Sequence, residues 1–245
     1  MVMLMHSHSN ELGQPIGAPM PQWTPPPRAK HVTLTGRYCR IEPLSATRHA
    51  ADLFAANALD ADGAGWTYLT AGPFADFAAY QAWVEKVSPG DDPLFHAIID
   101  LRTQKAVGVA AYMRLDPANG VIEIGSLKFT PLMQRTPVAT EAMFLMMRHA
   151  FAIGYRRYEW KCDSHNAPSR AAAQRYGFSY EGVFRQAMVT RQRNRDTAWY
   201  SIVDTEWPAI EAAFTRWLAP ENFDAAGKQK LSLSQLTAPL LKARG

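Results

Sequence analysis

Residues 134–140 combine residue types at a spacing that could bind an anionic group. A polar loop containing Arg135 leads here into an apolar helix pattern that begins at Pro137. The first backbone amides of a helix lack intrahelical partners and lie at the positive end of the helix dipole, so such a junction favours a phosphate. Thr136 and Thr140 add hydroxyl groups that could donate to the same ligand. A capped core helix is the alternative that this stretch alone leaves open.

A carboxylate lies in the strand pattern that precedes this loop. Glu123 alternates with Ile122 and Ile124, so its side chain faces the side of the strand opposite to theirs. There it could be a solvated strand residue or a general base that takes a proton from a reacting group. Gly125, two residues further on the same face, indicates a bulge or a close approach of a ligand.

Residues 166–178 form the second informative stretch. Asn166 is a good helix N-cap, and Gly177 can end the short helix between them. These local preferences explain the helix. They do not explain why an Asn-x-x-Ser motif ending at Ser169 and a Gly-Phe pair follow an acidic strand and a Gln-Arg-x-x-x-Ala loop.

This pairing of motifs resembles the GNAT acetyltransferases, and within them the branch that includes the ribosomal-protein N-terminal acetyltransferases. The resemblance extends over residues 34–218, and its further motifs are Trp66-Thr67-Tyr68-Leu69, Gly72-Pro73-Phe74, Glu123-Ile124-Gly125, Ala139-Thr140-Glu141-Ala142 and Glu181-Gly182. It implies an α+β (three-layer α/β) fold, in which helices cover both faces of a mixed, mostly antiparallel central sheet with a splayed strand pair.

The resemblance also implies an N-acetyltransferase that moves an acetyl group from acetyl-CoA to a primary amine by direct attack in a ternary complex. The amine would belong to a protein N-terminus or to a small molecule. Glu123 would be the general base and Ser169 the general acid. The residues expected to contact acetyl-CoA are Ser126, Leu127, Lys128, Phe129, Gln134, Arg135, Thr136, Val138, Ala139, Thr140, Asn166, Ser169, Arg170 and Arg175. Trp66, Tyr68 and Phe74 would form the acceptor wall, with core packing as the competing interpretation.

The sequence departs from the family pattern at two positions. Pro137 stands where the phosphate loop usually has its first glycine, which removes one amide that Arg135 or Thr136 could replace. Ala173 stands where many members carry a tyrosine that protonates the leaving thiolate, so Ser169, a water molecule or Tyr200 could take that role. These departures motivate the alternative of a CoA-binding regulatory or interaction protein whose catalysis is lost or weak.

The composition indicates which class of protein and which kinds of partner to expect. The 245 residues are 47% hydrophobic and 20% charged, which is typical of a globular protein. No apolar run is long enough for a transmembrane helix, and Met1–Met5 lack the features of a signal peptide, so we expect a cytoplasmic protein without a membrane partner. No zinc-binding spacing occurs, so no metal is expected, and Cys39 and Cys162 are expected to be small buried hydrophobes.

A late cluster of arginines contributes to the net charge of +4. Its members are Arg185, Arg191, Arg193 and Arg195. They could form a solvated hairpin, or a patch for an acidic substrate or a nucleotide phosphate. No RNP-like or KH-like signature accompanies them, so no nucleic-acid partner is expected. A homodimer is common in the family that the chain resembles.

Hydrophobic periodicity predicts the elements that would position these residues. The predicted strands are 31–44, 94–100, 106–115, 121–129, 155–162, 178–185 and 197–203, and the predicted helices are 46–58, 74–87, 137–154, 166–176 and 207–218. Residues 1–30 read as a Pro-rich N-terminal arm, residues 31–218 as the acetyltransferase domain, and residues 219–245 as a tail. One apolar run in that tail, residues 236–241, could dock back on the domain.

Overall fold

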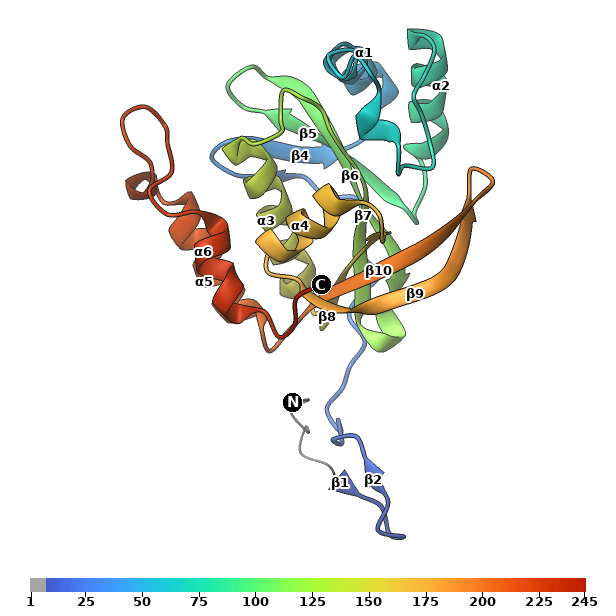
Figure 1. Ribbon diagram of the computed structural model, residues 1–245, viewed down its shortest axis with the longest axis vertical. Coiled ribbons are helices and arrows are strands. Elements are labelled where there is room, and N and C mark those ends of the chain that lie inside the picture. The colour runs from blue at the N-terminus through green and yellow to red at the C-terminus, as the bar shows by residue number, and fades with distance from the viewer. Residues whose placement is uncertain (1–7) are drawn as a thin grey trace.

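Helices cover both faces of an eight-stranded sheet in the computed structural model, which describes residues 8–245 (Figure 1). The helices are α1 (Ala46–Asn57), α2 (Phe77–Val87), α3 (Pro137–Ala152), α4 (Ala167–Arg175), α5 (Trp207–Leu218) and α6 (Leu233–Thr237). The strands are β1 (His8–Ser9), β2 (Pro15–Ile16), β3 (Leu34–Thr35), β4 (Cys39–Pro43), β5 (Leu94–Asp100), β6 (Lys105–Asp116), β7 (Val121–Phe129), β8 (Arg157–Asp163), β9 (Ser179–Thr190) and β10 (Arg193–Val203). The first seven residues of the predicted N-terminal arm, which include the Met1–Met5 run, lie outside the described residues.

The main sheet has the strand order β3-β4-β5-β6-β7-β8-β10-β9. Every neighbouring pair is antiparallel except β7 and β8, which run parallel from Val121 opposite Arg157 to Ile124 opposite Trp160. Beyond this point both strands continue without pairing to each other, so they splay apart. The predicted mixed, mostly antiparallel sheet with a splayed pair is therefore confirmed.

Apolar side chains pack on both faces of the sheet. One cluster joins the sheet to α3, α4 and α5, and the other joins it to α1 and α2. This arrangement gives the helix-sheet-helix layering seen in Figure 1. Cys39 and Cys162 are buried and free, as predicted, and burial raises the pKa of the Cys39 thiol.

Four predicted elements differ from the structure by more than two residues at an end. The single strand expected over 31–44 is two short strands, β3 and β4, joined by a turn. The helix expected from residue 74 begins at Phe77, because Asp76 caps it by accepting a hydrogen bond from the Ala79 amide (2.8 Å). Strand β9 continues to Thr190, beyond the predicted end at residue 185, and strand β10 begins at Arg193, before the predicted start at residue 197. These extra residues pair with each other as a hairpin beyond the apolar core.

The segments before β3 and after α5 both contact the main body. Near the N-terminus, the Trp23 indole donates a hydrogen bond to the Ala118 carbonyl (3.2 Å), while β1 and β2 lie apart from the sheet (Figure 1). Near the C-terminus, Leu233 is fully buried and the Thr237 hydroxyl donates to the Arg175 carbonyl (3.0 Å). Among residues 8–245, no helix has the length and apolar character needed to cross a membrane.

A buried carboxylate ties the first strands to α3. Glu141 is 5% exposed and accepts hydrogen bonds from the amides of Arg37 (2.8 Å), Tyr38 (2.6 Å) and Cys39 (2.8 Å). Gly36 lies so close to this carboxylate that a Cβ there would collide with it. The three amides of the β3–β4 turn thus depend on one side chain.

We expect Glu141→Gln to lower the free energy of unfolding by about 2–4 kcal/mol. In the variant the backbone amides of residues 37–39 lose a charged acceptor, and at least one of them faces the NH₂ group of the glutamine side chain. Denaturant unfolding followed by circular dichroism measures the change. The exposed Glu221 provides a control, and Glu221→Gln should change the stability by less than about 0.5 kcal/mol. Equal stabilities of the two variants would contradict this assignment.

The buried histidine on β5 predicts loss of stability in acid. Burial and the neighbouring His31 lower the pKa of His96 to about 4. The unfolded chain therefore binds a proton as the pH falls below about 6.5 while the folded chain does not. From pH 6.5 to pH 4 this residue should lower the free energy of unfolding by about 3 kcal/mol. His96→Gln should show a shallower decline than the wild type and than His165→Gln, which changes an exposed ring; parallel curves would contradict the prediction.

Candidate active site

One cleft of about 1080 Å³ opens where β7 and β8 separate. We call it the central cleft. Its lining comes from β7 and β8, the loop before α3, helix α4, residues 64–70, the β9–β10 hairpin and the loop after α5. The predicted site residues that line it are Tyr68, Glu123, Ser126, Leu127, Phe129, Gln134, Arg135, Thr136, Ala139, Thr140, Asn166, Ser169 and Arg175.

A β-bulge shapes the β7 wall. Gly125 pairs with Ala111 and Lys128 with Val109, so residues 126 and 127 both face Ala110. Ser126 takes a left-handed backbone conformation (φ 50°) at this bulge. Because β8 no longer pairs with β7 here, the polar backbone groups on that edge are available to a ligand. The bulge is one of the two features that Gly125 predicted.

The start of α3 forms the second wall. Thr136 is the N-cap and Pro137 the first helical residue, so the amides of the first turn have no intrahelical partner. The loop is held by its own side chains: Gln134 Nε2 donates to the Phe129 carbonyl (2.9 Å) and Thr136 Oγ1 to the Met133 carbonyl (2.7 Å). Since the Thr136 hydroxyl proton is used inside the loop, Arg135 is the side chain left to replace the amide that Pro137 lacks.

Helix α4 contributes hydroxyl and cationic groups. The Asn166 side chain caps the helix by accepting from the Ser169 amide (3.1 Å). Ser169 Oγ accepts a hydrogen bond from Trp160 Nε1 (3.0 Å) and lies beside the Cys162 thiol, which offers an acceptor for its proton. At the other end of the helix, Arg175 donates to Thr140 Oγ1 (3.0 Å), so a guanidinium stands beside the start of α3.

Four of the residues that the sequence suggested for the site do not line the cleft. The Arg170 guanidinium donates to Tyr200 Oη (3.2 Å) and to the Ser164 carbonyl (3.0 Å), and the residue does not line the cleft. Lys128 pairs with Val109 beyond the bulge, and its ammonium lies 2.7 Å from Asp60, so only its backbone could contact a ligand. Tyr200, one of the three candidates for the general acid, is fully buried beside Arg170 and outside the cleft lining. The side chain of Val138 is likewise buried in the core, so only its amide could serve a ligand.

Two of the three aromatic residues predicted for the acceptor wall belong to the core instead. Trp66 and Phe74 pack edge to face, with ring centroids 5.5 Å apart, within the cluster beneath α1 and α2. Only Tyr68 lines the cleft, and its hydroxyl donates to the His165 carbonyl (3.2 Å). The competing interpretation, core packing, therefore holds for Trp66 and Phe74.

Glu123 lies in the cleft wall within a chain of buried ion pairs. It is 2% exposed, 2.6 Å from Arg114 Nη1 and 3.1 Å from Lys161 Nζ. Lys161 also lies 2.6 Å from Glu159, which in turn pairs with Arg157 (2.7 Å). Burial raises the pKa of Glu123, and its two cationic neighbours offset part of that rise.

The sequence reasoning missed these partners of Glu123. Arg157, Glu159, Lys161 and Asp163 alternate along β8, and period-two alternation places them on the face that Glu123 occupies on the neighbouring strand. That alternation was the signal that could have identified the network.

The β9–β10 hairpin crosses one end of the cleft. Arg195 and its cross-strand neighbour Met188 contribute to the cleft lining, as Tyr68 and Thr70 do. At the hairpin tip, Arg191 donates to the carbonyls of Ala71 (2.9 Å) and Gly72. The tip and the 64–72 segment are thus joined, as the position of the hairpin beside that segment in Figure 1 illustrates.

The loop after α5 closes the other end of the cleft. Trp217, Phe223, Gly227, Lys228 and Gln229 line it there. The Trp217 indole donates to Gln229 (2.8 Å), which fixes the loop against α5. Residues after 218 read as a tail in the sequence, because a polar loop without periodicity carries no signal of a distant contact.

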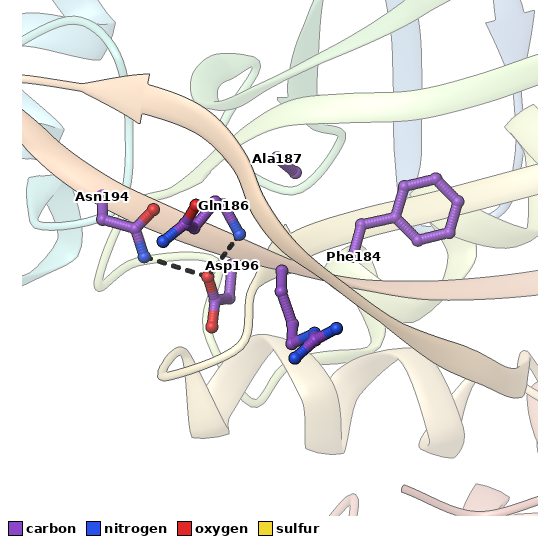
Figure 2. Close-up of a pocket in the computed structure, with 6 residues that line it drawn as sticks. Phe184, Gln186, Ala187, Asn194 and Asp196 are labelled. Carbon is purple, nitrogen blue, oxygen red and sulfur yellow. Dashed lines mark hydrogen bonds between the residues drawn. The ribbon is translucent and has the colours of Figure 1, made fainter.

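A second hollow lies on the β9–β10 hairpin. It is lined by Phe184, Arg185, Gln186, Ala187, Asn194 and Asp196. Figure 2 shows the Asp196 carboxylate accepting hydrogen bonds from the Gln186 amide (2.7 Å) and the Asn194 side chain (2.9 Å), while Phe184 points away. Because these local bonds engage its only acid, this hollow has no combination of groups that suggests chemistry.

The chain resembles proteins of known family. The family model described as Acetyltransferase (GNAT) domain matches residues 39–179. A GCN5-related N-acetyltransferase from Brucella melitensis is 51% identical with a TM-score of 0.87, and the match covers 89% of this chain and all of that one (100%). A probable acetyltransferase of the GNAT family from Chromobacterium violaceum ATCC 12472 is 40% identical, with a TM-score of 0.73 and coverage of 80% and 98%.

A more distant structure has the same fold. The microcin C7 self-immunity acetyltransferase, solved in complex with acetyl-CoA and AMP, is 21% identical with a TM-score of 0.60, and the match covers 69% of this chain and 93% of that one. Among curated proteins, none gives a significant match.

Proposed function

Because the chain belongs to the GNAT acetyltransferases, we propose that it moves the acetyl group of acetyl-CoA to a primary amine by direct attack in a ternary complex. The acceptor is the N-terminus of a protein or a small-molecule amine. The central cleft is the observation that carries this proposal, because an unpaired strand edge, a helix N-terminus and a buried carboxylate all line it. We also expect a cytoplasmic protein, and the homodimer and the narrower resemblance to the ribosomal-protein branch stay predictions.

Two parts of the cleft suit the two ends of acetyl-CoA in this proposal. Its pyrophosphate lies at the first turn of α3, where free amides, Arg135 and Arg175 favour negative charge. Its pantetheine arm follows the β7 edge and pairs with the backbone of residues 126–129. The distant microcin-immunity structure, which holds acetyl-CoA on the same fold, supports a cofactor of this kind.

Glu123 is the proposed general base. An amine must lose its proton before it attacks the thioester carbon, and a buried carboxylate with a raised pKa is a better proton acceptor than an ordinary one. As the C–N bond forms, backbone amides at the bulge stabilise the oxyanion. When the C–S bond breaks, the thiolate takes a proton from Ser169 or from water. The ammonium loses two protons in all: Glu123 takes the first and passes it to solvent, and the second, lost as the amide forms, replaces the proton that Ser169 or water gave to the thiolate.

We expect Glu123→Gln to lower kcat by about 10²–10⁴-fold, the usual contribution of general acid-base catalysis. The KM for acetyl-CoA should change less than twofold, which steady-state kinetics by free-thiol release can separate. Glu181→Gln is a suitable control, since Glu181 pairs with an arginine, Arg157, as Glu123 pairs with Arg114, but Glu181 does not line the cleft. Full activity of Glu123→Gln would remove Glu123 from the mechanism.

The pH profile provides an independent prediction. A base must be unprotonated to act, so kcat/KM falls as the pH drops through the pKa of Glu123. Because burial raises that pKa above the ordinary value of 4.5, the acidic limb should lie at a higher pH than a solvated glutamate would give. Residual activity of Glu123→Gln should lack this limb, and an unchanged acidic limb would point to another base.

The phosphate site predicts a selective effect on binding. Arg135→Gln should raise the Kd for acetyl-CoA roughly 10-fold, since a charge-assisted hydrogen bond contributes about 1.5–3 kcal/mol and exposure reduces this. Arg148→Gln removes the same charge from the exposed face of α3, outside the cleft lining, and should leave the Kd unchanged. Isothermal titration calorimetry with CoA compares them, and equal Kd values would disprove the placement of the pyrophosphate.

A further inference from the structure

Among the arginines that line the central cleft, Arg195 is distinguished by a buried nitrogen without a hydrogen-bond partner in the described part of the chain. Arg195 lines the cleft from β10, and the nitrogen is its Nε. Among residues 8–245, no carboxylate forms an ion pair with its guanidinium, whereas Arg114 and Lys161 both pair with Glu123. A buried donor left unsatisfied is unfavourable, so this guanidinium is well suited to an anionic partner that the protein itself does not supply.

The position of Arg195 points to the acceptor rather than to acetyl-CoA. Its strand belongs to the hairpin whose tip is fixed to the carbonyls of Ala71 and Gly72. That contact holds the hairpin beside the 64–72 segment, which contributes Tyr68 and Thr70 to the cleft lining. The proposed phosphate groups belong to other elements, Arg135 to the loop before α3 and Arg175 to the end of α4. The late arginine cluster therefore divides: Arg191 holds the hairpin in place, and Arg195 faces the cleft.

The acids in this part of the cleft are already engaged. Glu123 is held by Arg114 and Lys161. Asp163 accepts from the His165 amide (2.9 Å) and lies 3.1 Å from His165 Nδ1. Neither neutralises Arg195, so the acceptor end offers a free positive charge. A guanidinium binds carboxylate or phosphate through two parallel hydrogen bonds, which also fixes the orientation of the bound molecule.

We propose that the acceptor amine carries an anionic group, a carboxylate or a phosphate, and that Arg195 binds this group. This inference rests on the proposed acetyl transfer and names its substrate class. Arg195 would anchor the anionic end of the acceptor while its amine approaches Glu123 and the thioester. Amines without an anion, and polyamines above all, would lack this anchor.

The test compares matched amines with the full-length protein. The ω-amino carboxylates from glycine to 6-aminohexanoate and the aminoalkyl phosphates are each measured against the alkylamine of equal chain length. Free-thiol release gives kcat/KM for each amine, calculated with the concentration of the unprotonated form of that amine. The wild type should prefer the anionic member of at least one pair by about 10-fold or more. A preference for carboxylates or for phosphates identifies which anion Arg195 binds.

Variants separate the role of Arg195 from that of the cofactor site. Arg195→Gln should lower kcat/KM for the preferred anionic amine by about 10-fold to 100-fold, the loss expected for a hydrogen bond between charged groups. It should change the alkylamine rate and the KM for acetyl-CoA less than twofold. Arg195→Lys should retain part of the preference, because it keeps the charge without the planar fork. Arg193→Gln, on the exposed part of the same hairpin, should match the wild type.

Three results would overturn the proposal, and they differ from one another. Equal rates for anionic and neutral amines in the wild type would be compatible with acetyl transfer, but they would exclude an acceptor that must carry an anionic group. A raised KM for acetyl-CoA in Arg195→Gln would assign Arg195 to the cofactor. Binding of acetyl-CoA without turnover of any amine would reject the proposed function itself, and the substrate class with it.

Discussion

The short parallel pairing of β7 with β8 is the constraint on which the site depends. The two strands hold together from Val121 opposite Arg157 to Ile124 opposite Trp160, and then separate. Because they run parallel, the helices that follow them, α3 and α4, both begin near the open end of the pair. The separation therefore exposes a strand edge and brings two helix N-termini to the same cleft, where the bulge at Ser126 turns the β7 backbone further from a regular ladder.

Electrostatics in the cleft follow from the same arrangement. Side chains that alternate along β7 and β8 meet on the sheet face opposite α3, and there Glu123, Lys161 and Glu159 form a buried network. A buried ion pair is weak evidence of stability, since removal of the charges from water offsets much of the attraction. The network is better explained as a way to hold one carboxylate in a fixed place while burial raises its pKa. At the other end of the cleft, free amides and arginines give a positive site without any such compensation.

Much of this arrangement could be predicted from the sequence, and the exceptions share a physical cause. Periodicity placed the helices and strands, and alternation around Glu123 showed which side it faces. The same pattern cannot tell whether an aromatic side chain packs inside or lines a cleft, so both interpretations stayed open for Trp66, which lies in the core, and for Phe74, which packs against it. Motif spacing placed Arg170 correctly on α4, but it did not show where the side chain points. Hydrogen bonds to Tyr200 and to the Ser164 carbonyl determine that direction. The hairpin and the loop after α5 reach the cleft only through long-range packing, which leaves no local signal.

The central expectation is that acetyl-CoA binds in the gap between β7 and β8. A crystal structure of the protein with CoA tests it most directly. The pyrophosphate should lie at the first turn of α3, and the pantetheine arm should hydrogen-bond to the backbone of residues 126–129. A complex in which CoA binds elsewhere on the chain, or in which the gap stays closed and empty at saturating CoA, would contradict the account.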